Sequence, residues 1–564
     1  MRTLGLALGF GLAVPAVAQL PPQPGVIERV APAAPPRLGP ALLPPEPVRA
    51  TGPGEARRVA IGAVRIEGNT ALPAERLLGG VAPLHAREAT LAEIETARLA
   101  VLGAYRAAGF PYVAVTALLA PRPDRRADLV LRVTEGMIAE IALEGDIGAA
   151  EAQLRRFLAP LAGQRPIPAA ALERALLLAG DIPGISARGV LRPIAGEAGA
   201  LQLLVQVSRR PVSGFVNLDN RGQSMTGAWQ GLAVGQLNAF TGLGERTEIA
   251  LLETDGHGQS FAQLSEELFL GGSGLRLRLH AGAGRAEPGS PLAAIGYAGE
   301  TRVAGAMLSY PVIRSRPLNL TLTGGLDAFE SVVEASLAPG APRMRQSRDA
   351  VRALRLGLDG AMLDAWIGMA PAAATTTGLL RFSQGIEAFG ATRQGGARAG
   401  SDVGFAKLVA EATRLQPLFE PAEGWLVSVL GQVAGQWSDD MLPPAERYYL
   451  GGNRLGRGFY AGQVAGDRAL AGSAELQAGR VFDLPGLRLG TQFYAFRDEA
   501  RGWDNGPGSV RRSLASWGGG ARLQFDERVQ LDLEGVRRLT RRPEGANVTP
   551  LRETAIFARV LVRF

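Results

Sequence analysis

The stretch GGNRLGRG (451–458) is the part of the sequence whose residue types and spacing come closest to a binding site. Gly451, four residues, Gly456 and the cation Arg457 reproduce the spacing of a loop that binds nucleotide phosphates. The lysine of such a loop is missing, and Gly458 stands where a hydroxyl should bind magnesium. The flanking sequence also lacks the strand and helix between which a phosphate loop lies. A nucleotide site is therefore not expected.

An arginine on a glycine-rich loop can instead anchor that loop to another part of the protein. Gly451, Gly452 and Gly456 would act as hinges, because glycine lets a chain bend tightly and approach a neighbouring wall. A guanidinium away from water needs a partner, and it can bind a carboxylate through two parallel hydrogen bonds, which lysine cannot do. The alternative is a loop arginine exposed to water. The choice depends on the elements that position Arg457.

Other chemistry has little support in the sequence. The three histidines share no ligand spacing with acidic residues, so no metal site is expected, and no catalytic constellation or cofactor site stands out. The net charge of +7 comes from dispersed residues without a block of lysine or arginine, so nucleic acid is not an expected partner. The chain contains no cysteine.

The first residues have the parts of a secretory signal peptide. Arg2 precedes the apolar run LGLALGFGLAV, and the small residues AVA (16–18) predict cleavage after Ala18. We therefore assign 1–18 to a signal peptide. Residues 19–57 are rich in proline and alanine and have the composition of a linker.

Between 58 and 211 one order of elements occurs twice. VAIGAVRIEGN predicts a strand, two helical segments follow, and YVAVTALLAP and ADLVLRVTEG alternate as strands do. The same order returns from GMIAEIALEGD onward. Each half is a β-α-α-β-β unit of roughly 75 residues, so we predict tandem domains at 58–135 and 136–211. Helices on one face of each sheet would leave an edge strand free.

From 212 to 564 the helical periodicity gives way to short segments in which apolar and polar residues alternate. We count about 16 segments, an even number typical of a bacterial outer-membrane barrel. Short turns such as GGSG (271–274) alternate with long polar loops such as RRPEGANVTPLRE (541–553), as expected of an up-and-down barrel. We therefore predict a transmembrane β-barrel of antiparallel strands over 212–564, rather than a soluble β-protein.

Strand periodicity also suggests a partner for Arg457. In LRLGTQFYAFRDEA (487–500) the leucines and Phe493 would face lipid, so that Phe496 and Asp498 face the lumen. A carboxylate at Asp498 would satisfy the guanidinium of Arg457 if the loop 439–468 folds inward.

The whole arrangement resembles the two-partner secretion transporters, the TpsB or haemolysin secretion/activation family of the superfamily that joins POTRA domains to a barrel. Five motifs carry the likeness in chain order, namely VRIEGNT (64–70), AYRAAGF (104–110), LDNRGQSMTG (218–227), LGGNRLGRGFYAGQVAGD (450–467) and FRD (496–498). The fourth resembles an inward-folded loop with Arg457, Gly458 and Phe459 at its tip. The fifth resembles a strand motif that contributes Phe496 and Asp498. The resemblance implies that these two motifs lock the loop to the barrel wall.

The resemblance also implies an activity. The protein would be an outer-membrane transporter of a Gram-negative cell, not an enzyme, and its POTRA domains would bind a large unfolded exoprotein in the periplasm. Export through the barrel would need no nucleotide, the other partner would be membrane lipid, and a monomer is expected. An outer-membrane assembly insertase of the same superfamily is the alternative, although insertases usually carry more POTRA units. Because 19–56 is rich in proline, we assign no helix that plugs the barrel.

Overall fold

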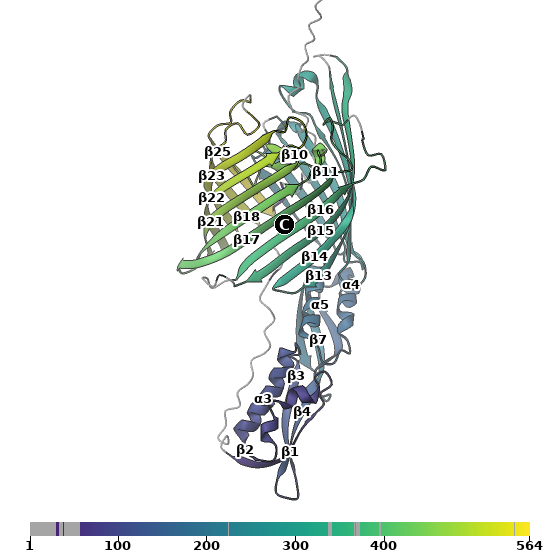
Figure 1. The fold of residues 1–564 in the computed structure, drawn as a ribbon, viewed down its shortest axis with the longest axis vertical. Helices are drawn as coiled ribbons and strands as arrows, with labels where there is room; N and C mark the ends of the chain where they lie inside the picture. Colours follow the sequence, from purple (N-terminus) through teal and green to yellow (C-terminus); the bar gives the residue numbers. More distant parts are fainter. Residues whose placement is uncertain are drawn as a thin grey trace, which may run out of the picture.

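The fold divides into a barrel and an N-terminal arm of two small units (Figure 1). The computed structural model describes residues 27, 30–32, 38, 57–223, 225–336, 341–365, 367, 373–393, 396–545 and 548–564. The predicted signal peptide (1–18), its cleavage site at Ala18 and most of the predicted linker (19–57) lie outside these residues. No helix among the described residues is long and apolar enough to cross a membrane.

Sixteen antiparallel strands of the described chain close into one barrel, which confirms the predicted fold class. They are β8 (Val212–Asp219), β9 (Gln230–Asn238), β10 (Arg246–Thr254), β11 (Gln259–Phe269), β12 (Arg276–Ala286), β13 (Ala298–Arg314), β14 (Leu318–Ser336), β15 (Arg343–Asp364), β16 (Ala374–Gly385), β17 (Ala406–Ala422), β18 (Trp425–Trp437), β21 (Arg468–Leu484), β22 (Leu487–Trp503), β23 (Arg511–Phe525), β24 (Val529–Arg538) and β25 (Thr554–Arg563). The last strand pairs with the first, from Arg559 opposite Asp219 to Arg563 opposite Phe215.

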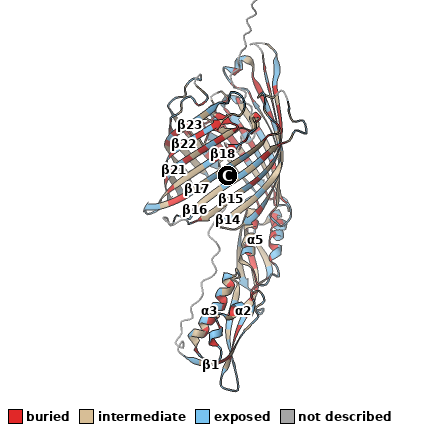
Figure 2. Cartoon of the chain, in the orientation of Figure 1, coloured by how far each residue is buried: buried red, intermediate tan, exposed pale blue. Residues whose placement is uncertain are grey.

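Alternation along the strands places apolar side chains outside and polar ones inside. On β22, Phe493 is 53% exposed whereas Tyr494, Phe496 and Asp498 are buried, and the same alternation is visible along many strands in Figure 2. This is the pattern of a barrel whose outer face meets lipid and whose lumen is polar. The orientation that the sequence predicts for β22 is therefore the observed one.

The arm contains two sheets, each with its helices on one face. The first has the strand order β2-β1-β4-β3 and the second β5-β7-β6. The first unit comprises β1 (Arg58–Glu67), α2 (Ala74–Leu78), β2 (Glu88–Thr90), α3 (Leu91–Ala107), β3 (Val113–Pro121) and β4 (Ala127–Glu135). The second comprises β5 (Met137–Gly145), α4 (Glu151–Leu158), α5 (Ala169–Asp181), β6 (Ile185–Pro193) and β7 (Ala200–Arg209). The additional short strand β2 ends at Thr90, which caps α3 in a capping box with Glu93.

The two sequence motifs of the first unit meet at one buried carboxylate. Glu135 ends β4 and is 3% exposed. It accepts hydrogen bonds from the backbone N–H groups of Thr70 (2.8 Å) and Ala71 (3.0 Å), from the Thr70 hydroxyl and from the Tyr105 hydroxyl (2.7 Å). Burial raises the pKa of the Glu135 carboxyl, but these donors outweigh burial and hold the pKa below its usual value. VRIEGNT and AYRAAGF are thus joined through Glu135.

A single residue, Gly136, separates the two units of the arm. Its N–H donates to the carbonyl of Tyr112 (2.9 Å), and its carbonyl accepts from the N–H of Ile167 (3.1 Å). A Cβ at this position would lie 2.3 Å from the Tyr112 oxygen, so only glycine fits. The N–H of Ala169 also donates to the carbonyl of Gly109 (2.9 Å) across the joint.

The second unit is bonded to the barrel rim that adjoins the arm, here called the near rim. Arg314, at the end of β13, binds Asp181 of α5 through two hydrogen bonds of 2.7 and 2.8 Å, and both side chains are largely buried. Arg174 of α5 donates to the carbonyl of Pro311 (2.9 Å), and Gln153 of α4 to that of Gly271 (2.8 Å). The helices of the second unit therefore lie against the turns β11–β12 and β13–β14.

Residues far upstream of the barrel contact its inner wall. The N–H of Ala31 donates to the carbonyl of Ile27 (2.7 Å), as in a helical turn. Ile27 and Val30 are 8% and 3% exposed, and they pack against buried apolar residues of β9, β10 and β11, including Leu232 and Phe261. The proline content of 19–56 does not predict a helix inside the barrel. Burial of these two side chains outweighs weak local propensity here.

Candidate functional site

The loop between β18 and β21 folds back into the barrel instead of extending beyond it. Its two limbs pair as a small hairpin of β19 (Tyr448–Leu450) and β20 (Val464–Gly466). Beyond this hairpin the glycine-rich stretch reaches the lumenal side of β21–β24, where Phe459 is fully buried with Leu450, Val464 and Leu514. This geometry places 451–458 against a wall, with no helix following it.

Asp498 on β22 binds both the side chain and the backbone of Arg457. The guanidinium donates from Nη2 to Oδ1 (2.9 Å) and from Nε to Oδ2 (3.1 Å). The N–H groups of Gly456 and Arg457 donate to the same Oδ2, at 3.1 and 2.8 Å. Arg457 is 5% exposed and Asp498 is fully buried. An ammonium could not form this two-pronged contact.

The guanidinium has three further neighbours on the same wall. Its Nη1 forms an ion pair with Glu475 of β21, and its Nη2 donates to the Ser473 hydroxyl (2.8 Å). The guanidinium carbon lies 3.6 Å from the centre of the Phe496 ring, a cation–π contact. Glu475 in turn binds Arg522 of β23 (2.7 Å). We call Arg457, Asp498, Glu475, Ser473 and Phe496 the tip lock.

The glycines of the loop have two different uses. Gly451, Gly452 and Gly456 have φ angles of 101°, 111° and 80°, in the region that L side chains rarely adopt. A Cβ on Gly458 would lie 2.6 Å from the Cβ of Ser516 on β23. Three glycines thus shape the turn and Gly458 permits the close approach to the wall.

The motif LDNRGQSMTG (218–227) contacts the loop tip from the other side. Arg221 donates to the carbonyl of Arg457 (2.6 Å) and to Glu534 of β24 (2.6 Å). Its guanidinium carbon also lies 4.1 Å from the centre of the Phe557 ring. Three motifs that are distant in sequence, those containing Arg221, Arg457 and Asp498, therefore converge in the lumen.

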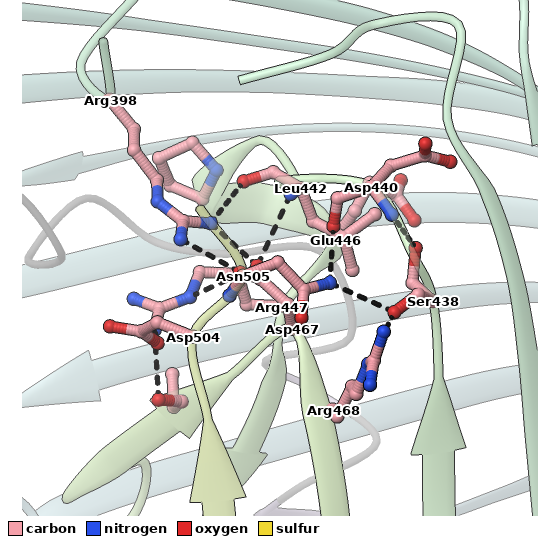
Figure 3. Close-up of polar contacts among 12 residues, drawn as sticks. Arg398, Ser438, Asp440, Leu442, Glu446, Arg447, Asp467, Arg468, Asp504 and Asn505 are labelled. Carbon is pink, nitrogen blue, oxygen red and sulfur yellow. Dashed lines mark hydrogen bonds and ion pairs between the residues drawn. The ribbon is translucent and has the colours of Figure 1, made fainter. Parts of the chain in front are cut away.

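A second charged cluster joins the root of the loop to its neighbours at the rim away from the arm, the far rim (Figure 3). Asp467 is fully buried and binds Arg398 through two hydrogen bonds of 2.5 and 2.7 Å. It also accepts from the N–H groups of Leu442 (3.2 Å) and Asn505 (2.7 Å). Arg447 forms an ion pair with Asp467 at 3.7 Å. We call Asp467, Arg398, Arg447 and Asn505 the root clamp.

Sequence reasoning found Arg457 and Asp498 but missed Glu475, Arg221 and the root clamp. Glu475 carries the same signal as Asp498, a carboxylate on the lumenal face of a strand next to β22. Asp467 and Arg398 carry no such signal, because they lie outside regular alternation. No group of three or more His, Asp or Glu residues in the described part of the chain could hold a metal ion.

A closed sixteen-stranded barrel with an inward loop and a two-unit arm is the architecture of outer-membrane proteins of the POTRA-plus-barrel class. Residues 358–523 match the model of the haemolysin secretion/activation protein ShlB/FhaC/HecB family. The heme/hemopexin transporter protein HuxB of Haemophilus influenzae strain 86-028NP is 23% identical over 255 residues, which cover 44% of this chain and 43% of HuxB. By these matches the chain is similar to the two-partner secretion transporters of the haemolysin secretion/activation family.

Solved structures show the same fold over nearly the whole chain. CdiB from Escherichia coli has a TM-score of 0.70 at 19% identity, and the match covers 94% of both chains. CdiB from Acinetobacter baumannii has a TM-score of 0.63 at 16% identity, with 95% of both chains covered. The sequence match to the curated relative is shorter and spans less than half of its length.

Proposed function

We propose that this protein receives a large unfolded exoprotein on its N-terminal units in the periplasm and exports it through the barrel without nucleotide. The observation that carries the proposal is the inward loop, which the tip lock holds against β21–β24. A loop held by polar contacts inside a lumen can leave its position and return, as a gate must do. The near rim would then face the periplasm and the far rim the cell exterior.

Receipt of the exoprotein requires a surface that recognises an extended chain. The edge strands β3 and β6 have one unpaired side each, and Leu118 and Leu119 of β3 are 37% and 39% exposed. An unfolded segment can pair with such an edge through its backbone, in β-augmentation. The energy for export would come from folding of the exoprotein outside the cell, which removes exported chain from the equilibrium.

The test is export of a partner encoded beside this gene in cells that express the full chain or a variant lacking 58–135. We expect the deletion to abolish export while the barrel still inserts and migrates in a heat-modifiable way on gels. Normal export by the deletion variant would contradict the receiving role. Loss of other barrel proteins from the membrane would instead indicate an assembly insertase.

A further inference from the structure

The tip lock attaches only the tip of loop 439–468 to the barrel wall. Between its root and its tip the loop borders a lumenal cavity of about 630 Å³, lined mainly by residues of β11–β18 and of the loop itself. The wall residues of the tip lock lie on β21 and β22, outside this sector of the wall. Something else must therefore hold the loop on the cavity side.

The most buried group that does so is Glu446, which is 2% exposed, while Tyr448 and Arg454 of the loop also bind Glu411 of β17. Its carboxylate binds Arg355 of β15 through two hydrogen bonds of 2.7 and 2.8 Å, and it forms an ion pair with Lys407 of β17 at 2.8 Å. The carbonyl of Glu446 accepts from Lys407 (2.6 Å) and from Gln436 (3.2 Å). Both cations are also largely buried.

Apolar packing around Glu446 closes the same end of the cavity. Leu442 is fully buried, and with Ala445 it packs against Phe329, Val351 and Phe405. Phe329 and Val351 also line the cavity, together with Ala445, Glu446 and Lys407. The cavity therefore ends, toward the far rim, at a layer formed by the loop root and the wall.

We propose that Glu446, Arg355 and Lys407 form a second anchor, which holds the root of loop 439–468 across the cavity and closes its outer end. This inference rests on the proposed function for its meaning, because the cavity is then the route of the exported chain. Passage along β11–β17 requires Glu446 to leave its two cations. The tip lock positions the loop on one sector of the wall and the second anchor on another.

The buried Glu446 carboxylate holds the loop firmly against the wall, but another acceptor for its two cations can release it. Removal of the Glu446 charge leaves the buried ammonium of Lys407 without its ion pair and Arg355 with Asp327 alone (3.1 Å), so the closed position of the loop is destabilised. An incoming polypeptide could replace Glu446, because its own carboxylates and carbonyls can accept from Arg355 and Lys407. Glu446, Arg355 and Lys407 are thus positioning residues for export.

The experiment measures ion conductance of the full chain in planar bilayers, which requires no exported partner. We expect Glu446→Gln to raise the occupancy of conducting states by roughly tenfold or more, since loss of a buried charge pair shifts a two-state equilibrium by at least this factor. Glu446→Asp keeps the negative charge, so its occupancy of conducting states should lie between those of the unaltered protein and of Glu446→Gln. The matched control is Asp359→Asn on β15, the strand that also carries Arg355. This variant removes a half-exposed lumenal carboxylate that lies 3.8 Å from Arg381.

Because the chain has no cysteine, a single Ala445→Cys gives a second readout. Labelling by a membrane-impermeant maleimide on intact cells should be slow in the otherwise unchanged protein and several-fold faster with Glu446→Gln. Should Glu446→Gln fail to insert, Lys407→Gln preserves the Arg355 contact and should give a smaller increase in both readouts. Unchanged conductance and labelling in inserted variants would overturn the second anchor and leave export untouched. Absence of export by the unaltered protein would contradict the proposed function alone.

Discussion

Asp498 holds Arg457 twice, by its guanidinium and by its backbone N–H. The carboxylate thereby fixes the position of the loop as well as the direction of the side chain. The remaining donors to Asp498 are the N–H of Gly456 and the hydroxyl of Ser473. Truncation of the Arg457 side chain leaves these donors in place. The attachment of the loop to the wall is therefore weakened but not abolished.

Arg457→Ala should reduce export strongly without preventing insertion. The loss of the side-chain contacts costs the inward position about 1–3 kcal/mol, because polar groups of a buried cluster lose a charged partner. Asp498→Ala should produce a similar defect, and the double variant should be little worse than either single variant. Arg457→Lys should restore export in part only. Export assays and protease access to the loop provide the measurements, and strictly additive defects would contradict the pairing.

Asp467→Asn should loosen the far-rim loops that meet at the root clamp. Loss of the charge removes the ion pairs with Arg398 and Arg447 and should lower local stability by about 1–3 kcal/mol. Hydrogen exchange of 396–405 and 504–510 would measure the change. Asp439→Asn is the matched control, since Asp439 pairs with Arg468 on the surface and its side chain is 78% exposed. Equal exchange in the two variants would argue against the clamp.

Asp181→Ala should loosen the attachment of the second unit to the near rim. Arg314 would keep its hydrogen bond to Asn319 but lose both hydrogen bonds to Asp181. The interface would thereby lose about 1–3 kcal/mol of stability. Faster hydrogen exchange in α5 and in the turn 314–317 is the expected result. Glu151→Ala removes an exposed pair with Arg155 within α4 and serves as the control. No difference from this control would mean that the interface does not depend on the pair.

Asp128 makes the first unit sensitive to acid. A hydrogen bond from the N–H of Ala63 and contacts with Arg122 and Arg65 lower the pKa of Asp128 from 3.8 to about 2. Because the folded pKa is the lower one, Asp128 stabilises the fold above pH 3.8, and this contribution disappears as the pH falls toward 2. Asp128→Asn should therefore destabilise the unit at neutral pH, and the difference from the unaltered protein should vanish near pH 2. Urea unfolding followed at 222 nm reports the helices, and a difference that persists at pH 2 would contradict this.

The barrel and the β22 residues of the tip lock, Phe496 and Asp498, could be predicted because side chains alternate between the two faces of a strand. Alternation gave the lumenal face of β22, and with it Asp498, before any contact was known. The second anchor could not be predicted in this way. From the sequence, Lys407 and Arg355 indicate only that their strands have a polar face. Their contact with Glu446 depends on the path of the folded loop, which alternation does not predict. Ile27 and Val30 were missed for a related reason, since tertiary packing decides their conformation.

The joint at Gly136 and the bonded helices of the second unit have a mechanical consequence. A flexible tether would absorb a pull on the first unit, but hydrogen bonds cross the joint on both sides and Arg314 fastens the second unit to the end of β13. In the proposed export, the arm would act as a lever that pivots on the turns β11–β12 and β13–β14. Traction applied by a bound chain at the distal end would arrive as torque on strands that line the lumenal cavity.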